Sequence, residues 1–489
     1  MRVNRRQFLG YCATASLTAV TLKPSSFSIA PPLVDRVRVR LDYAHDLFRS
    51  EMQGRYLTIN TLLRKYQVET TPGNYAKEYA DEESLHDAGT VREFADTIRK
   101  NIAGARITWA FSWLALVDIS PRYAEIRELV KNYHREFGDE VTYCPGGYFA
   151  SRWSGRDEIN RELARALDRI EQWMGGYRPT SLIAGMLPAA CIRFARRELG
   201  ITVVQGQIWS QYNVDAGDSE GSISYPYYPS TEHFLKPAQD DADFIDCVNL
   251  DGWTVDFVAG RFRGGLQKNG GRINSRLGLG PIETLHTYGR EIGLQELKAT
   301  SKAHLSDENL RRNPFAWITT NYEVSEVARG RQRKAGLAAF GEWLAWLKST
   351  WADLQCATLA EFGARVRANY PTNEHLKYIL RQSGSGVGGS FAGEEVTWFM
   401  NQSFRLAVLR HKGETLVIDY TDYRQKYAEP QGVGERNWSL WGEINQKQLR
   451  PQDQPVPIQE FANRWPRVVR DLHQIYPEAA EVKEFFGKS

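Results

Sequence analysis

Residues 181–204 read SLIAGMLPAACIRFARRELGITVV, and this stretch decides the fold class. A short apolar run at 181–184 is followed by an amphipathic segment at 189–199 and by a second, β-branched run at 201–204. A strand, a helix and a strand in direct succession form a βαβ unit, in which the two strands run parallel. The chain is therefore predicted to contain a parallel sheet covered by helices.

The same alternation extends in both directions from this unit. Further strands are predicted at 37–41, 68–71, 107–113, 141–143, 248–250 and 316–318. The segments between them have the spacing of amphipathic helices, including one over 57–66. About seven or eight such units favour an α/β fold with a closed or slightly irregular (β/α) barrel. No Gly-x-Gly-x-x-Gly motif follows the first strand, which argues against a dinucleotide-binding sheet.

One long segment, 205–243, interrupts the rhythm. It is rich in Tyr, Pro, Ser and Asp and has no helical periodicity. Loops of this length inside a compact domain are usually functional. Its acidic residues Asp215, Asp218 and Glu220 fit either a calcium site or a solvated acidic loop.

The C-terminal third has a different pattern. Residues 384–390 read GSGVGGS and predict a flexible joint. Beyond it, alternating runs at 404–410 and 415–420 flank His411-Lys412-Gly413-Glu414 and predict a β-hairpin. The sequence thus predicts a barrel over 31–365, a linker over 366–390, a small β domain over 391–450 and a helical tail over 451–489.

The first thirty residues predict an export signal. Arg5 and Arg6 precede Phe8-Leu9, an apolar stretch follows, and the segment ends in small residues around Ala30. Paired arginines at this place resemble the twin-arginine motif, whose pathway exports folded proteins. We therefore expect residues 1–30 to be a twin-arginine signal peptide and the mature protein to be periplasmic or secreted. No later stretch is long and apolar enough to span a membrane.

The amino-acid composition limits the classes of ligand that the protein is expected to bind. Without the predicted signal the chain has 58 basic and 59 acidic residues, and nucleic-acid binding needs a basic surface that such a balance does not supply. The 14 Trp and 23 Tyr fit two readings: a large core, or a site that stacks sugar rings. The four remaining cysteines are widely spaced and are expected to be buried free thiols.

Candidate site residues stand where the predicted strands end, because the active site of a parallel barrel lies at the C-terminal ends of its strands. Asp251 and Glu283 are the predicted acid/base pair, with Asp42 as the third candidate. Aromatic, amide and acidic side chains at the other strand ends are predicted to bind the substrate: Trp109, Trp113, Tyr143, Trp209, Gln211, Asn213, Asp215, Trp253, Asn321 and Glu323.

Each of these candidates also has a structural explanation. Trp109 and Trp113 fit core packing, Asp251 beside Gly252 fits a turn, and Glu283 fits ordinary charge in the first turn of a helix. Asp42 fits a helix cap in the same way.

Several segments resemble known families. Residues 62–71, 177–201 and 358–362 resemble parts of the NodB-type polysaccharide deacetylases and of the family 57 glycoside hydrolases, which have (β/α)7 barrels. The run from Trp209 to Asp215, the run YPYYPS at 225–230 and the sequence Asp251-Gly252-Trp253 look like a poorly characterised family of exported bacterial proteins with a barrel and a small C-terminal domain.

The resemblance to the deacetylases lacks one motif. Those enzymes bind a divalent metal through an Asp and the two histidines of His-x-x-x-His, and this sequence contains no His-x-x-x-His. Asp42, His45 and His86 are the candidates for a partial metal site. The sequence therefore favours an exported glycoside hydrolase that acts on an oligo- or polysaccharide without a cofactor. The alternatives are a deacetylase that uses one divalent metal ion and a barrel that only binds glycans.

Overall fold

The computed structural model describes residues 52–69, 83–85, 87–151, 154–207, 209, 219–265, 273–328, 333–435, 437–448 and 450–487. The predicted signal at 1–30 and the predicted strand at 37–41 lie outside these ranges. So do Asp42, His45, His86, Gln211, Asn213 and Asp215. Within the described ranges, no helix has both the length and the apolar character needed to cross a membrane.

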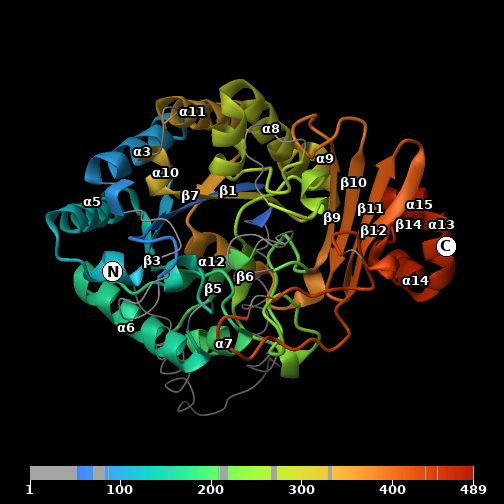
Figure 1. Cartoon of the computed structure of the whole chain (residues 1–489), viewed down its shortest axis with the longest axis horizontal. Helices are drawn as coiled ribbons and strands as arrows, with labels where there is room; N and C mark the ends of the chain where they lie inside the picture. The colour runs from blue at the N-terminus through green and yellow to red at the C-terminus, as the bar shows by residue number, and fades with distance from the viewer. Residues whose placement is uncertain are drawn as a thin grey trace, which may run out of the picture. The chain divides into compact units, whose positions relative to one another are not determined.

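Eight parallel strands of the described residues form the main sheet (Figure 1). They are β1 Arg55–Leu63, β2 Ile107–Phe111, β3 Glu140–Tyr143, β4 Ser181–Ile183, β5 Val203–Gln207, β6 Val248–Asp251, β7 Ala316–Glu323 and β8 Gln355–Ala357. Their order is β6-β5-β4-β3-β2-β1-β7, and β8 also pairs with β1. Successive strands of the chain are therefore neighbours from β1 to β6, the usual arrangement for consecutive βαβ units.

Helices cover the outside of this sheet (Figure 1). The longer ones are α3 Ala88–Asn101, α5 Pro121–Phe137, α6 Arg156–Met174, α7 Ala189–Glu198, α8 Thr287–Leu305, α11 Arg333–Thr350 and α12 Leu359–Asn369. The shorter ones are α4 Trp113–Val117, α9 Asp307–Arg312 and α10 Val324–Ala328. Single turns are η1 Glu83–Leu85, η2 Pro145–Tyr148, η3 Asp241–Asp243, η4 Ala259–Arg261, η5 Ile282–His286, η6 Asn373–His375 and η7 Pro451–Asp453. In α6 the buried Ile159, Leu163 and Leu167 recur every four residues, which places one apolar face on the sheet.

The two ends of the sheet meet through Thr254 and Thr319. Thr254 N donates to Thr319 O at 3.0 Å, and Thr319 N donates to Thr254 Oγ1 at 3.0 Å, so the segment after β6 closes onto β7. Inside the ring, the Thr319 hydroxyl lies 2.8 Å from Thr58 Oγ1, 3.1 Å from Asn60 Nδ2 and 3.0 Å from Gln205 Nε2. The predicted (β/α) barrel with a small C-terminal β domain is confirmed.

The prediction for residues 57–66 was wrong. They do not form a helix, because residues 55–63 are β1, the strand that pairs with β2, β7 and β8. All nine residues of β1 are buried. A strand that is covered on both faces has no polar side to produce period-two alternation, so its apolar residues can match a helical spacing by chance.

The C-terminal sheet is antiparallel, in the order β13-β12-β11-β10-β9, with β14 against β12. Its strands are β9 Lys377–Ser383, β10 Glu395–Asn401, β11 Phe404–His411, β12 Glu414–Asp422, β13 Ile444–Asn445 and β14 Val456–Pro457. The predicted hairpin is thus β11 and β12. The tail helices α13 Ile458–Arg464, α14 Pro466–Ile475 and α15 Ala480–Phe486 pack on this sheet through Phe461, Val468 and Leu472 (Figure 1).

The segment predicted as a linker, 366–390, contains part of the fold. It includes the end of α12 and the whole of β9, which pairs with β10 from Ser383 opposite Glu395 onward. The glycine-rich run forms the ordered β9–β10 connection, since Gly384 N donates to Glu394 O at 2.8 Å and Gly386 N to Ser390 O at 2.7 Å. Glycine content alone could not distinguish this hydrogen-bonded loop from a flexible joint.

A buried arginine joins the sheet to the barrel. Arg405 of β11 is fully buried and contacts Glu220 at 2.5 Å and Asp419 at 2.7 Å through Nη2. Its Nη1 donates to the carbonyl oxygens of Trp209 at 3.0 Å and Ser222 at 3.1 Å. Glu220, predicted as a calcium ligand or a solvated acid, is instead a buried ion-pair partner.

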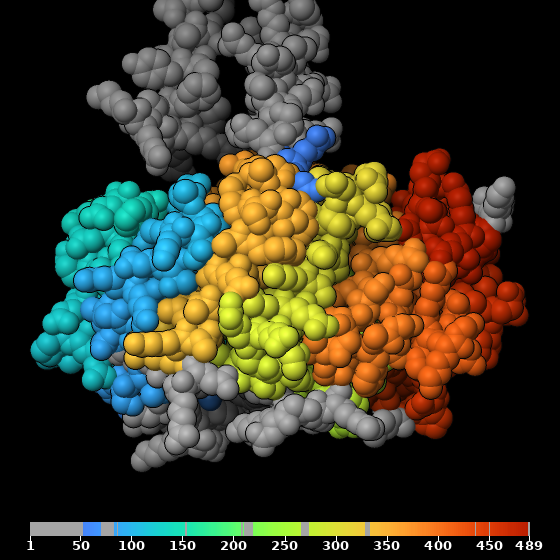
Figure 2. Space-filling model, turned by 90° about the horizontal axis from the view of Figure 1, so that it is seen from above, coloured from blue at the N-terminus to red at the C-terminus, as the bar shows by residue number. Residues whose placement is uncertain are grey.

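Other contacts support this joint. Lys447 Nζ lies 2.6 Å from the second oxygen of Glu220. On the face that Figure 2 shows, α8 and α9 (yellow) lie between α11 and the C-terminal sheet (orange). The barrel and the sheet are thus connected by buried charges and by packed helices.

Replacing Arg405 by Ala should destabilise the protein by about 3–5 kcal/mol, because Glu220 and Asp419 would stay buried without their cation. Urea unfolding, followed by circular dichroism, measures the loss. The control is Arg464→Ala, which removes an exposed i,i+4 pair with Glu460 and should cost less than about 1 kcal/mol. Equal unfolding midpoints for the two variants would contradict the central role of Arg405.

Candidate functional site

A cavity of about 350 Å³ opens where the barrel strands end. We call it the mouth cavity. Its walls come from the segments after β1, β3 and β6, from the end of β7 and from η5 and α10. The residues that line it are Leu62, Arg64, Gln67, Tyr148, Phe149, Trp253, Arg276, Ile282, Glu283, Asn321, Glu323 and Glu326.

The first ion pair in the mouth cavity joins Arg64 to Glu323. The parallel register places Leu62 opposite Glu323, so the residues after β1 lie beside the end of β7. Arg64 Nη2 pairs with the Glu323 carboxylate, and Arg64 Nη1 donates to Gly147 O at 2.7 Å. One buried guanidinium therefore holds the ends of β1 and β7 and the turn after β3 in place.

The second ion pair joins Arg276 to Glu283 at 2.6 Å. The guanidinium of Arg276 also lies 5.2 Å from the centre of the Trp253 ring, within the range of a cation–π contact. Glu283 stands on η5, a π-helical turn, and such turns recur at functional sites. A Cβ at Gly280 would lie 2.5 Å from Glu283 Oε2, so a side chain at this position would displace the Glu283 carboxylate.

Polar atoms of Trp253 and Asn321, both in the cavity lining, have no hydrogen bond within the described part of the chain. They are the indole nitrogen Nε1 of Trp253 and the amide oxygen Oδ1 of Asn321, and both are buried. The first is a donor and the second an acceptor. Because unsatisfied buried polar groups are costly, this pair indicates that a polar ligand or water completes the site.

The turn after β3 is strained beside this cavity. Tyr148 has φ 104°, in the left-handed region that residues other than glycine rarely adopt. A Cβ at Gly147 (φ 66°) would lie 3.1 Å from Gln67 O, so glycine is required where the two loops touch. The Tyr148 hydroxyl donates to Gly206 O, which ties the turn to β5. Strain of this kind persists where the surroundings hold a functional geometry.

Comparison with known proteins places the chain in a family. Residues 49–400 match DUF3863, a domain of unknown function with a solved structure. The chain belongs to the DUF3863 family. Residues 405–478 match a second domain of unknown function, DUF3864. No curated protein matches the sequence.

The DUF3863 barrel also resembles solved structures. A candidate glycoside hydrolase/deacetylase from Parabacteroides distasonis is 38% identical, with a TM-score of 0.81 over 87% of this chain and 98% of that one. More distant is a candidate polysaccharide deacetylase from Mycobacterium smegmatis, at 14% identity and a TM-score of 0.40 over 65% and 91% of the two chains. A GH57-type branching enzyme from Pyrococcus horikoshii has 10% identity and a TM-score of 0.38 over 64% and 70%. The P. distasonis relative confirms the resemblance seen in the sequence.

Four predicted site residues line the mouth cavity of the DUF3863 barrel: Glu283, Trp253, Asn321 and Glu323. Asp251 does not line it. Its carboxylate accepts hydrogen bonds from Gly252 N at 3.0 Å and Trp209 N at 3.3 Å, and burial raises its pKa well above the usual range of an aspartate. The structure therefore does not bring Asp251 and Glu283 into one cavity as an acid/base pair.

Three predicted aromatic residues belong to the core of the DUF3863 barrel. Trp109 is fully buried and donates to Asp139 Oδ2 at 2.7 Å, Tyr143 donates to Glu162, and Trp209 packs against Trp398 at 4.7 Å between ring centres. Trp113 begins α4 and packs, partly buried, against the core. For Trp109 and Trp113, core packing was the alternative to a sugar-binding role in the sequence analysis.

Sequence reasoning missed several lining residues, chiefly Arg64, Arg276, Tyr148 and Glu326. Arg64 directly follows the strand that was mistaken for a helix, so its place at a strand end was hidden. The described residues contain no group of three or more His, Cys, Asp or Glu side chains placed to hold a metal ion. The six candidates outside the described ranges, including Asp42, His45 and His86, remain predictions.

Glu162 generates a pH-dependent prediction. Burial raises the pKa of Glu162 to about 7, against the opposing hydrogen bonds from the Tyr143 hydroxyl and Gly146 N. Between pH 4.5, its unperturbed pKa, and about 7, the folded state binds a proton that the unfolded state releases, so this group loses stabilising effect as pH rises. Over that pH range the wild type should lose about 3 kcal/mol in its free energy of unfolding through Glu162. Glu162→Gln cannot titrate and should not show this loss.

Urea unfolding of both proteins at pH 5 and pH 7.5 measures this effect. The stability of Glu162→Gln relative to the wild type should increase between the two pH values. Parallel stability profiles for the two proteins would show that Glu162 does not titrate in this range.

Proposed function

We propose that this protein is a carbohydrate-active hydrolase, a glycoside hydrolase, whose reaction takes place in the mouth cavity. The observation that carries the proposal is the gathering of Glu283, Glu323 and Glu326 around a cavity in which Trp253 Nε1 and Asn321 Oδ1 are unsatisfied. The P. distasonis relative, described as a candidate glycoside hydrolase/deacetylase, supports the same class.

The lining of the cavity suits a sugar. Its volume of about 350 Å³ lies at the small end of the range for ligand sites, about 300–1,000 Å³. A sugar hydroxyl both donates and accepts, so hydroxyls can satisfy the indole N–H of Trp253 and the amide oxygen of Asn321 together. The rings of Trp253, Tyr148 and Phe149 offer apolar surface for the C–H face of a pyranose.

The charges divide the catalytic roles. Glycoside hydrolysis needs one carboxylic acid that protonates the leaving oxygen and one carboxylate that attacks the anomeric carbon or activates water. Arg276 and Arg64 hold Glu283 and Glu323 in ion pairs, and we assign these two as the candidates for the nucleophile or base. Glu326, the third acid of the cavity, is then assigned as the proton donor.

The test compares Glu323→Gln, Glu326→Gln and the wild type on a panel of oligosaccharides, with release of reducing ends and of acetate measured in parallel. Each variant should lose about 10²–10⁴-fold in kcat, because acid/base catalysis contributes that much. Glu326→Gln should also remove the alkaline limb of the pH–rate profile. The control Asp251→Asn keeps the shape of a residue outside the cavity and should stay within about tenfold of the wild type.

The other outcomes separate the alternatives. If acetate is released and no new reducing ends appear, the reaction is deacetylation and not cleavage of a glycosidic bond. If oligosaccharides bind and neither reducing ends nor acetate are released, the protein is a barrel that only binds glycans. A large loss in Asp251→Asn with full activity in Glu326→Gln would overturn the assignment of the proton donor.

We also propose export by the twin-arginine pathway, on the basis of Arg5 and Arg6 before Phe8-Leu9. Replacement of both arginines by lysine should move the protein from the exported fraction to the cytoplasm. Fractionation of cells that express the two forms, followed by immunoblotting, measures this. An unchanged distribution would contradict the proposed route.

A further inference from the structure

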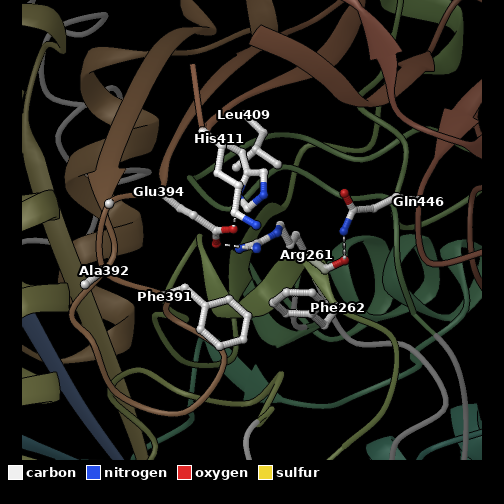
Figure 3. A pocket seen from close by; sticks show the side chains of 10 residues that line it. Arg261, Phe262, Phe391, Ala392, Glu394, Leu409, His411 and Gln446 are labelled. Atoms are coloured by element: carbon white, nitrogen blue, oxygen red, sulfur yellow. Dashed lines mark hydrogen bonds and ion pairs between the residues drawn. The ribbon is translucent and has the colours of Figure 1, made fainter. Parts of the chain in front are cut away.

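A second cavity, of about 700 Å³, shares no lining residue with the mouth cavity (Figure 3). It lies where the loop after η4 meets the C-terminal sheet. Arg261 and Phe262 enter it from the barrel, Phe391 and Glu394 from the connection before β10, and His411 and Lys412 from the end of β11. We call it the joint pocket.

The acidic group of the joint pocket is already neutralised. Glu394 is buried, and its two oxygens are taken by Arg261 and by His411 Nδ1, the latter at 2.6 Å (Figure 3). Arg261 uses Nη1 on Val258 O at 2.6 Å. The carboxylate is therefore not available to bind a cation, and Arg261 is fixed in position.

The donor that remains is the ammonium group of Lys412. Lys412 is exposed, and no hydrogen bond or ion pair to another described residue occupies this group. His411 contacts Glu394 through Nδ1, which fixes its ring and leaves Nε2 facing away from that carboxylate. An anionic group on a ligand would complement the ammonium group of Lys412.

An aromatic wall lies opposite. The Phe391 ring is 37% exposed and meets Phe262 edge to face at 5.7 Å, and Phe262 lies 4.0 Å below the Arg261 guanidinium (Figure 3). Two rings held in this way offer an apolar surface beside the charged donors. A pyranose ring that bears an acidic group presents the same two features, an apolar face and an anion.

We propose that the joint pocket binds an acidic unit of a saccharide chain, such as a uronate. This inference extends the proposed function, since it names the chemical class of the polymer. The mouth cavity and the joint pocket are linked: a Cβ at Gly389 would lie 3.2 Å from the Phe262 ring and 3.5 Å from Asn274 N, and Asn274 Nδ2 donates to Glu283 O at 2.9 Å.

Isothermal titration with tetragalacturonate tests the proposal, and its methyl ester, which has the same backbone without charge, is the matched ligand. Lys412→Asn is the sharpest variant. Lys412 and Gly413 have φ 49° and 84° in the β11–β12 turn, and Asn-Gly is the preferred pair for such a turn, so the fold is preserved. This variant should bind the acid about tenfold more weakly and the ester unchanged, because a charged hydrogen bond is lost.

Phe391→Ala should weaken binding of both ligands, and Phe391→Trp should restore it. A sulfated tetrasaccharide shows whether carboxylate or sulfate is preferred, and tight binding of either acid supports the pocket. Equal affinity for the acid and the ester, or equal affinity of wild type and Lys412→Asn for the acid, would overturn it.

Glu323→Gln separates this proposal from the proposed function. That variant should lose turnover and keep its affinity for tetragalacturonate. If the wild type binds the acid at the joint pocket but hydrolyses no glycan, the proposed function fails and the pocket stands. If it hydrolyses glycans and Lys412→Asn changes no affinity, the pocket fails and the proposed function stands.

Discussion

The guanidinium of Arg405 is the buried cation at the centre of the contact between barrel and sheet. Its five N–H bonds reach two carboxylates and two backbone carbonyls, so nothing on this cation is left unsatisfied. Burial, together with the nearby charge of Glu220, raises the pKa of Asp419 to about 6, although Arg405 opposes the shift. Burying these charges therefore costs free energy, and removing one partner costs more. This favours one arrangement of the barrel and the sheet over similar alternatives. It also fixes Trp209, whose backbone N–H bonds Asp251 at the end of β6.

The mouth cavity repeats this design on a smaller scale. Arg64 spans a carboxylate and the carbonyl of Gly147, and Arg276 spans a carboxylate and the face of Trp253. In both places an arginine of the fold fixes the position of an acid. The placement of these carboxylates is thus a property of the loop packing, since a shift of either arginine would move the carboxylate that it contacts.

The sequence predicted the fold well where helices have one apolar face, as in α3, α5 and α6, and failed where burial is complete, as in β1. Glu283, Trp253, Asn321 and Glu323, which the sequence offered as site candidates, line one cavity, because strand ends converge in any parallel barrel. Asp251 stands at a strand end too, yet its carboxylate turns to the backbone N–H groups of Trp209 and Gly252. No sequence pattern distinguishes those two orientations. Arg64 was missed because the strand before it was mistaken for a helix, and Arg276 because no arginine was among the residue types sought.

The tryptophan content shows why composition could not decide between core and sugar site. Trp109, Trp209, Trp317, Trp343, Trp398 and Trp438 are all fully buried, so most of the signal comes from packing. Among the described residues, Trp253 is the tryptophan that lines the mouth cavity. Its indole N–H has no hydrogen-bond partner among those residues, but the indole N–H groups of the core residues Trp209 and Trp398 have none either, so an unpaired indole does not by itself mark a site. What separates Trp253 from the core tryptophans is its place in the cavity, next to the guanidinium of Arg276 and in the same lining as Glu283, and composition does not contain that information.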